Sequence, residues 1–125
     1  KLDGYIADAA KTFPVGNISE EKVKLLKVTR EALQLGIKQV KPGKRVGDIS
    51  HAIQSWVEKN GFSVVKELFG HGVGYFLHED PVIPNFGQAN TGQVLREGMV
   101  LALEPMVNFG KLKHLKCFSQ ISCVY

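Results

Sequence analysis

Apolar residues recur at helical spacing in two stretches of the chain, and the first predicts a helix that begins near Ser19. The Ser19 hydroxyl can accept hydrogen bonds from the free N–H groups of a first turn, and the two acids that follow it suit the positive end of a helix dipole. Gly36 weakens the far end of this helix. The predicted apolar face consists of Val23, Leu26, Leu33 and Ile37.

The second helical pattern is more regular and runs from about Asp48, a plausible cap, to the Asn60-Gly61 turn. Its apolar positions follow the i, i+3, i+4, i+7 rule closely, so we interpret them as core packing and assign Trp56 no functional role. These positions are Ile49, Ala52, Ile53, Trp56 and Val57.

The remaining apolar segments alternate or run together as strands do. Residues 12–15 predict a short strand before Gly16, residues 62–65 a second strand, and residues 99–107 an apolar strand-like run broken by the single acid Glu104. Between them, residues 70–87 are dense in glycine, histidine, proline and aromatic residues. Helices and strands in this order predict an α+β or α/β fold.

Composition fits a soluble globular domain, with 44% hydrophobic and 22% charged residues among 125. No stretch approaches the ~18 uninterrupted apolar residues of a membrane helix. The net charge of +4 falls to +1 without the three lysines of the last fifteen residues, so no basic stripe for nucleic acid is expected. Cys117 and Cys123 lack zinc-knuckle spacing, and we expect them reduced in a cytoplasmic protein.

Three places break the local pattern and are candidates for chemistry. Asp8, in an apolar stretch, is a turn residue, a cap or a ligand. Glycines on both sides of His71 allow a sharp bend and leave its imidazole uncrowded. His78 lies seven residues further on, which in an unbroken strand would place the two rings on opposite faces, but a bend could direct both into one cavity.

Glu104 is the third candidate, because a carboxylate at the end of a buried strand is costly to ionise without a cation or partner. Pro105 should end or bend the strand there. The alternative is a buried glutamate paired with an arginine or with backbone N–H groups. Together, Asp8, His71 and Glu104 form a carboxylate and imidazole set suited to Zn, Mn, Fe or Co.

Four motifs in this order resemble type I methionine aminopeptidases, over about residues 1–110. They are Asp3-Gly4-Tyr5-Ile6-Ala7-Asp8, Gly70-His71-Gly72-Val73-Gly74, His78-Glu79-Asp80-Pro81 with Ile83-Pro84-Asn85, and Gly98-Met99-Val100 through Glu104-Pro105-Met106-Val107. The resemblance implies the α+β pita-bread fold, with an antiparallel sheet, two long helices and two divalent metal ions per complete site. It also implies removal of the N-terminal methionine from nascent proteins.

By motif position, Asp8 resembles the family's second, bridging aspartate, His71 its histidine ligand and Glu104 its first glutamate. His78 resembles the histidine that binds substrate and stabilises the developing oxyanion. Tyr5 and Leu77 are expected to contribute to an apolar pocket for methionine.

The resemblance also has limits. The family's first aspartate would precede Lys1, and no acid follows Glu104, so only three of its five ligands are expected in this chain. The chain opens without a methionine, like the interior of something longer. We therefore expect a partial catalytic domain over residues 1–110, an atypical tail over residues 111–125, and an incomplete site.

Two rivals remain open: a related proline-specific aminopeptidase, and a non-catalytic pita-bread module that binds peptide or RNA. In the leading hypothesis the partner is a nascent chain that begins with methionine. We further expect ribosome association of the parent protein and no membrane partner.

Overall fold

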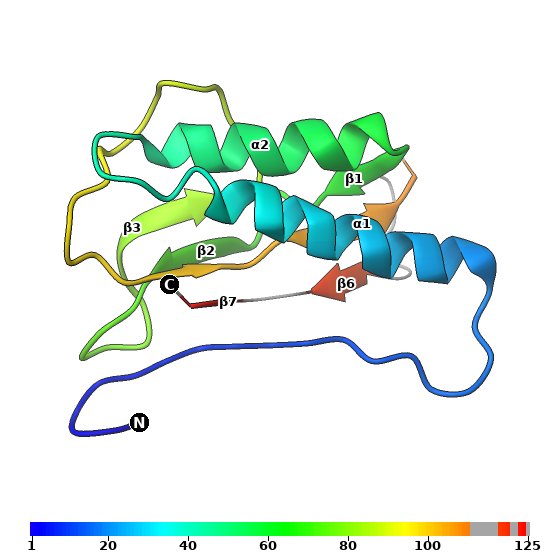
Figure 1. Ribbon diagram of the computed structural model, residues 1–125, viewed down its shortest axis with the longest axis horizontal. Helices are drawn as coiled ribbons and strands as arrows, with labels where there is room; N and C mark the ends of the chain where they lie inside the picture. Colours follow the sequence, from blue (N-terminus) through cyan, green and yellow to red (C-terminus); the bar gives the residue numbers. More distant parts are fainter. Residues whose placement is uncertain (111–117, 121–122, 125) are drawn as a thin grey trace.

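The computed structural model describes residues 1–110, 118–120 and 123–124. Two helices lie side by side over the strands, and the N-terminal segment runs along the opposite side (Figure 1). The helices are α1 (Glu20–Ile37) and α2 (Val46–Lys59). The strands are β1 (Phe62–Val64), β2 (Phe69–Gly72), β3 (Glu79–Pro84), β4 (Leu101–Leu103), β5 (Met106–Phe109), β6 (Phe118–Gln120) and β7 (Cys123–Val124).

The strands form two antiparallel sheets, ordered β1-β5-β6 and β3-β2-β4-β7. The apolar run of residues 99–107 passes from one sheet to the other, because β4 ends before Glu104-Pro105 and β5 begins after it. The predicted break is therefore confirmed. Of the tail predicted for residues 111–125, only the β6 and β7 backbone is described; Cys117 lies outside the described residues.

Helix α1 begins as predicted, since the Ser19 side chain accepts a hydrogen bond from the Lys22 N–H. Its predicted apolar face was partly wrong, because Val23 is 52% exposed while Thr29 is fully buried. Thr29 can lie in the core because its hydroxyl donates to the Leu25 carbonyl at 2.8 Å. A polar residue that satisfies itself within the helix is hidden from a hydrophobicity pattern.

Helix α2 begins two residues before the predicted cap. Asp48 is the third residue of the helix, and its carboxylate accepts from the Arg45 N–H and the Asn90 N–H, both at 2.9 Å. These two bonds lower the pKa of Asp48. The predicted core stripe is confirmed, with Ile49, Ile53 and Val57 buried and Trp56 packed against them.

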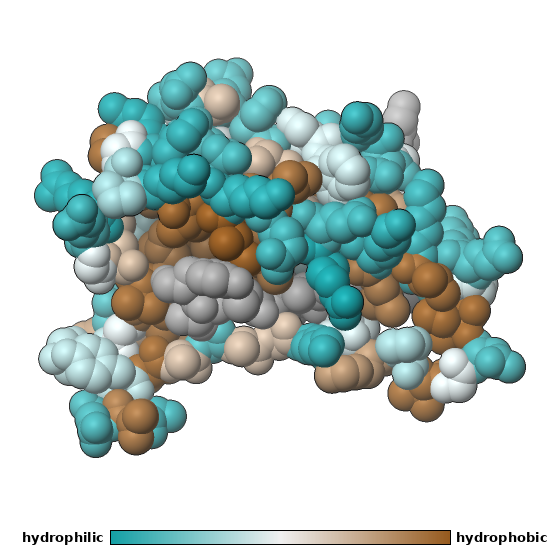
Figure 2. All heavy atoms as spheres, in the orientation of Figure 1, coloured by the Kyte–Doolittle hydropathy of each residue, from teal (hydrophilic) through white to brown (hydrophobic). Residues whose placement is uncertain are grey.

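The strand predicted for residues 12–15 was wrong: this segment belongs to no strand. Its residue types favour extended backbone, but a strand also needs a neighbouring chain in register, which a local pattern cannot supply. Phe13 and Val15 are exposed. In Figure 2 hydrophilic residues cover the helices, and hydrophobic ones gather beneath them and along the N-terminal segment.

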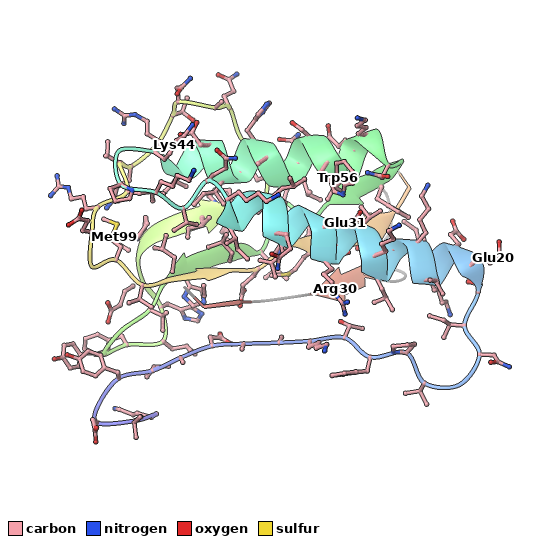
Figure 3. All side chains as sticks on the ribbon, viewed as in Figure 1. Glu20, Arg30, Glu31, Lys44, Trp56 and Met99 are labelled. Carbon is pink, nitrogen blue, oxygen red and sulfur yellow. The ribbon has the colours of Figure 1, made fainter. Side chains whose placement is uncertain are left out.

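The two ends of the molecule differ in what they present. Figure 3 places Lys44 and Met99 at one end, in the turns that precede α2 and β4, and Glu20 at the other end, at the start of α1. The loop of residues 73–78 joins β2 to β3, and His71 pairs with Ala102 of β4. The candidate site lies where these strands meet the N-terminal segment.

Candidate metal centre

His71 is the third of the four residues of strand β2, and the glycines beside it let the neighbouring strands come close. A Cβ on Gly70 would lie 2.4 Å from the Ala102 carbonyl oxygen of β4, and one on Gly72 would lie 2.2 Å from the Asp80 carbonyl oxygen. The β2–β3 register also shifts between His71 and Gly72. The glycines thus allow the neighbouring strands to approach closely, and they permit the irregularity that redirects strand β2.

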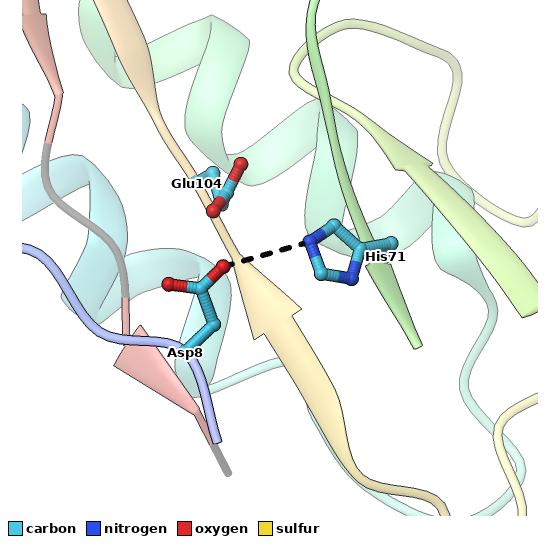
Figure 4. Close-up of side chains that lie close together, drawn as sticks. All are labelled: Asp8, His71 and Glu104. Carbon is cyan, nitrogen blue, oxygen red and sulfur yellow. Dashed lines mark ion pairs between the residues drawn. The ribbon is translucent and has the colours of Figure 1, made fainter. Parts of the chain in front are cut away.

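The structure brings Asp8, His71 and Glu104 together from three separate segments (Figure 4). Their ligand atoms all lie within 4.8 Å of one another, and they are the one such group of acids, histidines and cysteines in the part of the chain that the structure describes. His71 and Glu104 are buried, and the Asp8 side chain is one-third exposed.

The orientation of the His71 ring is set by its own strand. Its Nδ1 lies 2.8 Å from the Gly72 carbonyl oxygen, and a carbonyl only accepts, so Nδ1 carries the proton of this bond. In the neutral ring Nε2 then presents its lone pair, which faces Asp8. A histidine that donates one ring N–H to a carbonyl while the other nitrogen is free is the usual arrangement of a metal ligand.

The spacing of the cluster fits a small divalent ion. His71 Nε2 and Asp8 Oδ2 are 4.0 Å apart, which is too long for a hydrogen bond. It is about twice the ~2.0–2.2 Å of a typical bond from such a metal to nitrogen or oxygen. Two carboxylates around one imidazole also offer negative charge that a cation would balance. The donor chemistry and the distances therefore agree.

His78 lies beside the cluster, with its ring centroid 4.4 Å from that of His71 in an edge-on arrangement. The expectation that a bend brings both imidazoles to one place is confirmed. The chain reverses between β2 and β3, so strand alternation does not apply across it. An open hollow of about 440 Å³ exposes this region and is lined by both histidines, Phe69, Gly70, Glu79, Asp80 and Val82.

Tyr5 and Leu77, the residues predicted for a methionine pocket, are not among those that line the hollow. Both are exposed, Tyr5 by 55% and Leu77 by 44%. Tyr5 instead stacks on Tyr75 with ring centroids 4.7 Å apart and hydroxyl oxygens 2.9 Å apart. This hydrogen bond, partial burial and the charge of Glu79 raise the pKa of Tyr75. Nothing in the sequence pattern had indicated this tyrosine pair.

The chain belongs to metallopeptidase family M24, whose family model matches residues 1–120. It is 59% identical over 110 residues to methionine aminopeptidase 1 of Bacillus subtilis, covering 88% of this chain and 44% of that protein. The chain thus spans less than half the length of this relative.

Solved structures agree on the fold. A methionine aminopeptidase from Rickettsia prowazekii superposes with a TM-score of 0.86 at 38% identity, over 98% of this chain and 54% of that one. A prolidase from Pyrococcus furiosus gives 0.80 at 26% identity, over 98% and 34%. The predicted α+β pita-bread architecture is confirmed for the part of that fold that the chain spans. No helix among the described residues is long and apolar enough to cross a membrane.

Proposed function

We propose that this chain is the part of a methionine aminopeptidase that holds one side of its metal site, in a protein that removes N-terminal methionine. The observation that carries the proposal is the cluster of Asp8, His71 and Glu104 in a member of family M24. Residues 1–110 supply all three side chains, so we propose them as the catalytic portion and residues 111–125 as an appended tail.

In this proposal Asp8, His71 and Glu104 hold a divalent ion, with Co, Mn, Fe and Zn as the candidates for a mixed carboxylate and imidazole set. The ion supplies a Lewis acid and an activated water when bound, and a complete site holds two. The Gly72 carbonyl keeps His71 in the tautomer that a metal requires.

His78 acts on the substrate. Its ring lies against the edge of His71, close enough to donate a hydrogen bond to the oxygen of a peptide carbonyl placed at the cluster. Such a donor stabilises the negative charge that develops as the scissile carbonyl becomes tetrahedral. Tyr5 and Leu77, both exposed, remain proposed contacts for the methionine side chain.

The substrate is the N-terminus of a peptide or nascent protein that begins with methionine. New chains carry that residue where translation takes place, so we propose a cytoplasmic location and contact with the ribosome. The curated relative named above is a methionine aminopeptidase, and its 59% identity favours this substrate over the X-proline substrates of a prolidase.

The test is metal-dependent release of methionine from Met-Gly-Met-Met, with Co²⁺ or Mn²⁺ added to the metal-free protein. We compare the 125-residue chain with a longer version that carries the flanking segments of the Bacillus subtilis relative. Methionine release by the longer version, abolished by His71→Ala and Glu104→Gln and retained by His51→Ala, would support the proposal. Equal cleavage of Ala-Gly-Met-Met would overturn the methionine specificity, and activity that survives His71→Ala would overturn the site.

A further inference from the structure

We propose that Glu79 is a positioning residue that couples the two chain segments on which the metal cluster is built. Glu79 opens strand β3 and directly follows His78. Its carboxylate fixes the loop of residues 73–78, and this loop in turn is bonded to the segment that carries Asp8. The inference deepens the proposed function, and its consequence for catalysis rests on that proposed function.

Glu79 contacts the backbone of the loop directly. Glu79 Oε1 accepts a hydrogen bond from the Phe76 N–H at 2.8 Å, while the Gly74 N–H donates to the Phe76 carbonyl at 3.2 Å. The carboxylate fills the place that a side chain on Gly74 would take. A Cβ there would lie 2.9 and 3.0 Å from its two oxygens. The absence of a side chain at Gly74 is therefore what lets the carboxylate reach the backbone.

The same loop is also bonded to the N-terminal segment. The Gly74 carbonyl accepts a hydrogen bond from the Ile6 N–H at 2.7 Å, two residues before Asp8. The stacked pair of Tyr5 and Tyr75 reinforces the same junction through its 2.9 Å hydroxyl contact. No other backbone bond within the described residues joins Ile6 to the rest of the chain.

The loop also determines where His78 lies relative to His71. His78 is the last residue of the loop and directly precedes Glu79, and its ring centroid lies 4.4 Å from that of His71. Release of the Glu79 carboxylate would free the end of the loop at His78 and its middle at Gly74 together. One acid thus fixes the relative placement of Asp8, His71 and His78 through the backbone bonds of the loop. A charged acceptor suits this task, because it bonds an N–H about twice as strongly as a neutral one.

The experiment measures amide hydrogen exchange of Phe76 and Ile6 in the metal-free 125-residue chain. Glu79→Ala should speed exchange at both amides about ten- to a hundredfold, the worth of a bond to a charged acceptor. Glu79→Gln keeps an acceptor and should show less than about a tenfold effect. Gly74→Ala pushes the carboxylate away and should resemble Glu79→Ala. The Glu79→Ala background removes the three atoms nearest to the added methyl, so the double variant should be no worse than either single one.

Glu67→Ala is the matched control, since this surface carboxylate also accepts a backbone N–H, that of Lys66 at 3.1 Å, but lies outside the loop. It should leave both amides unchanged. Unchanged exchange at Ile6 in Glu79→Ala, or additive effects of Gly74→Ala and Glu79→Ala, would overturn the inference. If Glu79→Ala fails to fold, Gly74→Ala should still speed exchange at both amides, and Glu79→Gln should still show less than about a tenfold effect. Unchanged exchange at Ile6 in Gly74→Ala would then overturn the inference. No turnover is measured, so a failure of methionine release leaves this result standing by itself.

Discussion

At the scale of single residues, the cluster depends on how the His71 ring is held. The Gly72 carbonyl fixes the proton on Nδ1 and directs Nε2 toward Asp8. Burial shields His71 and Glu104 from water, which strengthens their interaction with any cation between them. A ligand set of this kind is pre-arranged, so little reorganisation accompanies binding.

His71→Ala should lower the affinity for Mn²⁺ by at least about a hundredfold, because loss of even an outer partner of a metal ligand costs 10–100-fold. Isothermal titration of the metal-free protein measures it. The matched control is His51→Ala, an exposed histidine on α2 whose ring lies 3.4 Å from the Ser55 hydroxyl. Equal affinities of the parent and His71→Ala would remove His71 from the site.

At the scale of helices and loops, one carboxylate at the start of α2 joins this helix to a loop that is distant in sequence. Asp48 accepts from the Arg45 N–H at the helix terminus and from the Asn90 N–H, forty-two residues further along the chain. Both bonds are stronger to the ionised form, which is why they lower the pKa of Asp48.

The Asp48 bonds should make stability fall in acid. A folded-state pKa below the ordinary 3.8 means that the contribution is complete above 3.8 and is lost as the pH drops through the folded-state value. Asp48→Asn should therefore lower the melting temperature at pH 7, and the gap to the parent should close below pH 3.8. Thermal melts from pH 7 to pH 2.5 measure this. A gap that stays constant with pH would show that ionisation of Asp48 does not matter.

The close contact between α1 and α2 predicts that replacing Gly36 by alanine lowers the stability of the protein. Alanine favours a helix over glycine by about 1 kcal/mol, yet a Cβ on Gly36 would lie 3.0 Å from two side-chain carbons of buried Ile53. Overpacking costs about 1–3 kcal/mol. Gly36→Ala should thus destabilise the protein by up to about 2 kcal/mol in urea unfolding.

Ile53→Val should partly relieve this contact, because valine lacks Cδ1, one of the two carbons that the new methyl meets. The double variant should be more stable than the sum of the two single effects predicts. Additive effects would show that the helices move apart freely, and a stabilised Gly36→Ala variant would show that propensity outweighs packing here.

On the scale of the whole molecule, apolar side chains are unevenly distributed. The helices present a hydrophilic outer surface, whereas the N-terminal segment exposes Phe13 by 67% and Val15 by 90% (Figure 2). Their neighbours Thr12, Pro14 and Ile18, together with part of α1, line a hollow of about 550 Å³. Exposed apolar surface of this kind promotes association.

The double substitution Phe13→Ser and Val15→Ser should reduce self-association of the 125-residue chain, because it removes the two large exposed apolar side chains of residues 11–18. Sedimentation velocity over a tenfold concentration range measures the change. Val100→Ser, a 44% exposed valine before β4, is the control and should have little effect. Association that persists in the double variant would assign it to another surface.

The chemistry of the site was accessible from the sequence because residue type and immediate neighbours carry it. Asp8 in an apolar stretch, glycine-flanked His71 and Glu104 before Pro105 each break the local pattern, and together they indicate a metal site. The second helix was also predictable, since regular apolar spacing fixes a buried face whatever covers it.

Only the tertiary structure decided which side chains meet in the site and which chain segments are coupled to one another. The strand predicted at residues 12–15 was wrong, and the buried Thr29 was missed, because both depend on partners that a local pattern does not contain. The same holds for Glu79: its role follows from Phe76, Gly74 and Ile6 meeting in space. The sequence alone therefore determined which groups could bind a metal, whereas chain reversal at β2–β3 and the bond at Ile6 decided that they meet, because hydrogen bonds between segments remote in sequence act only after folding.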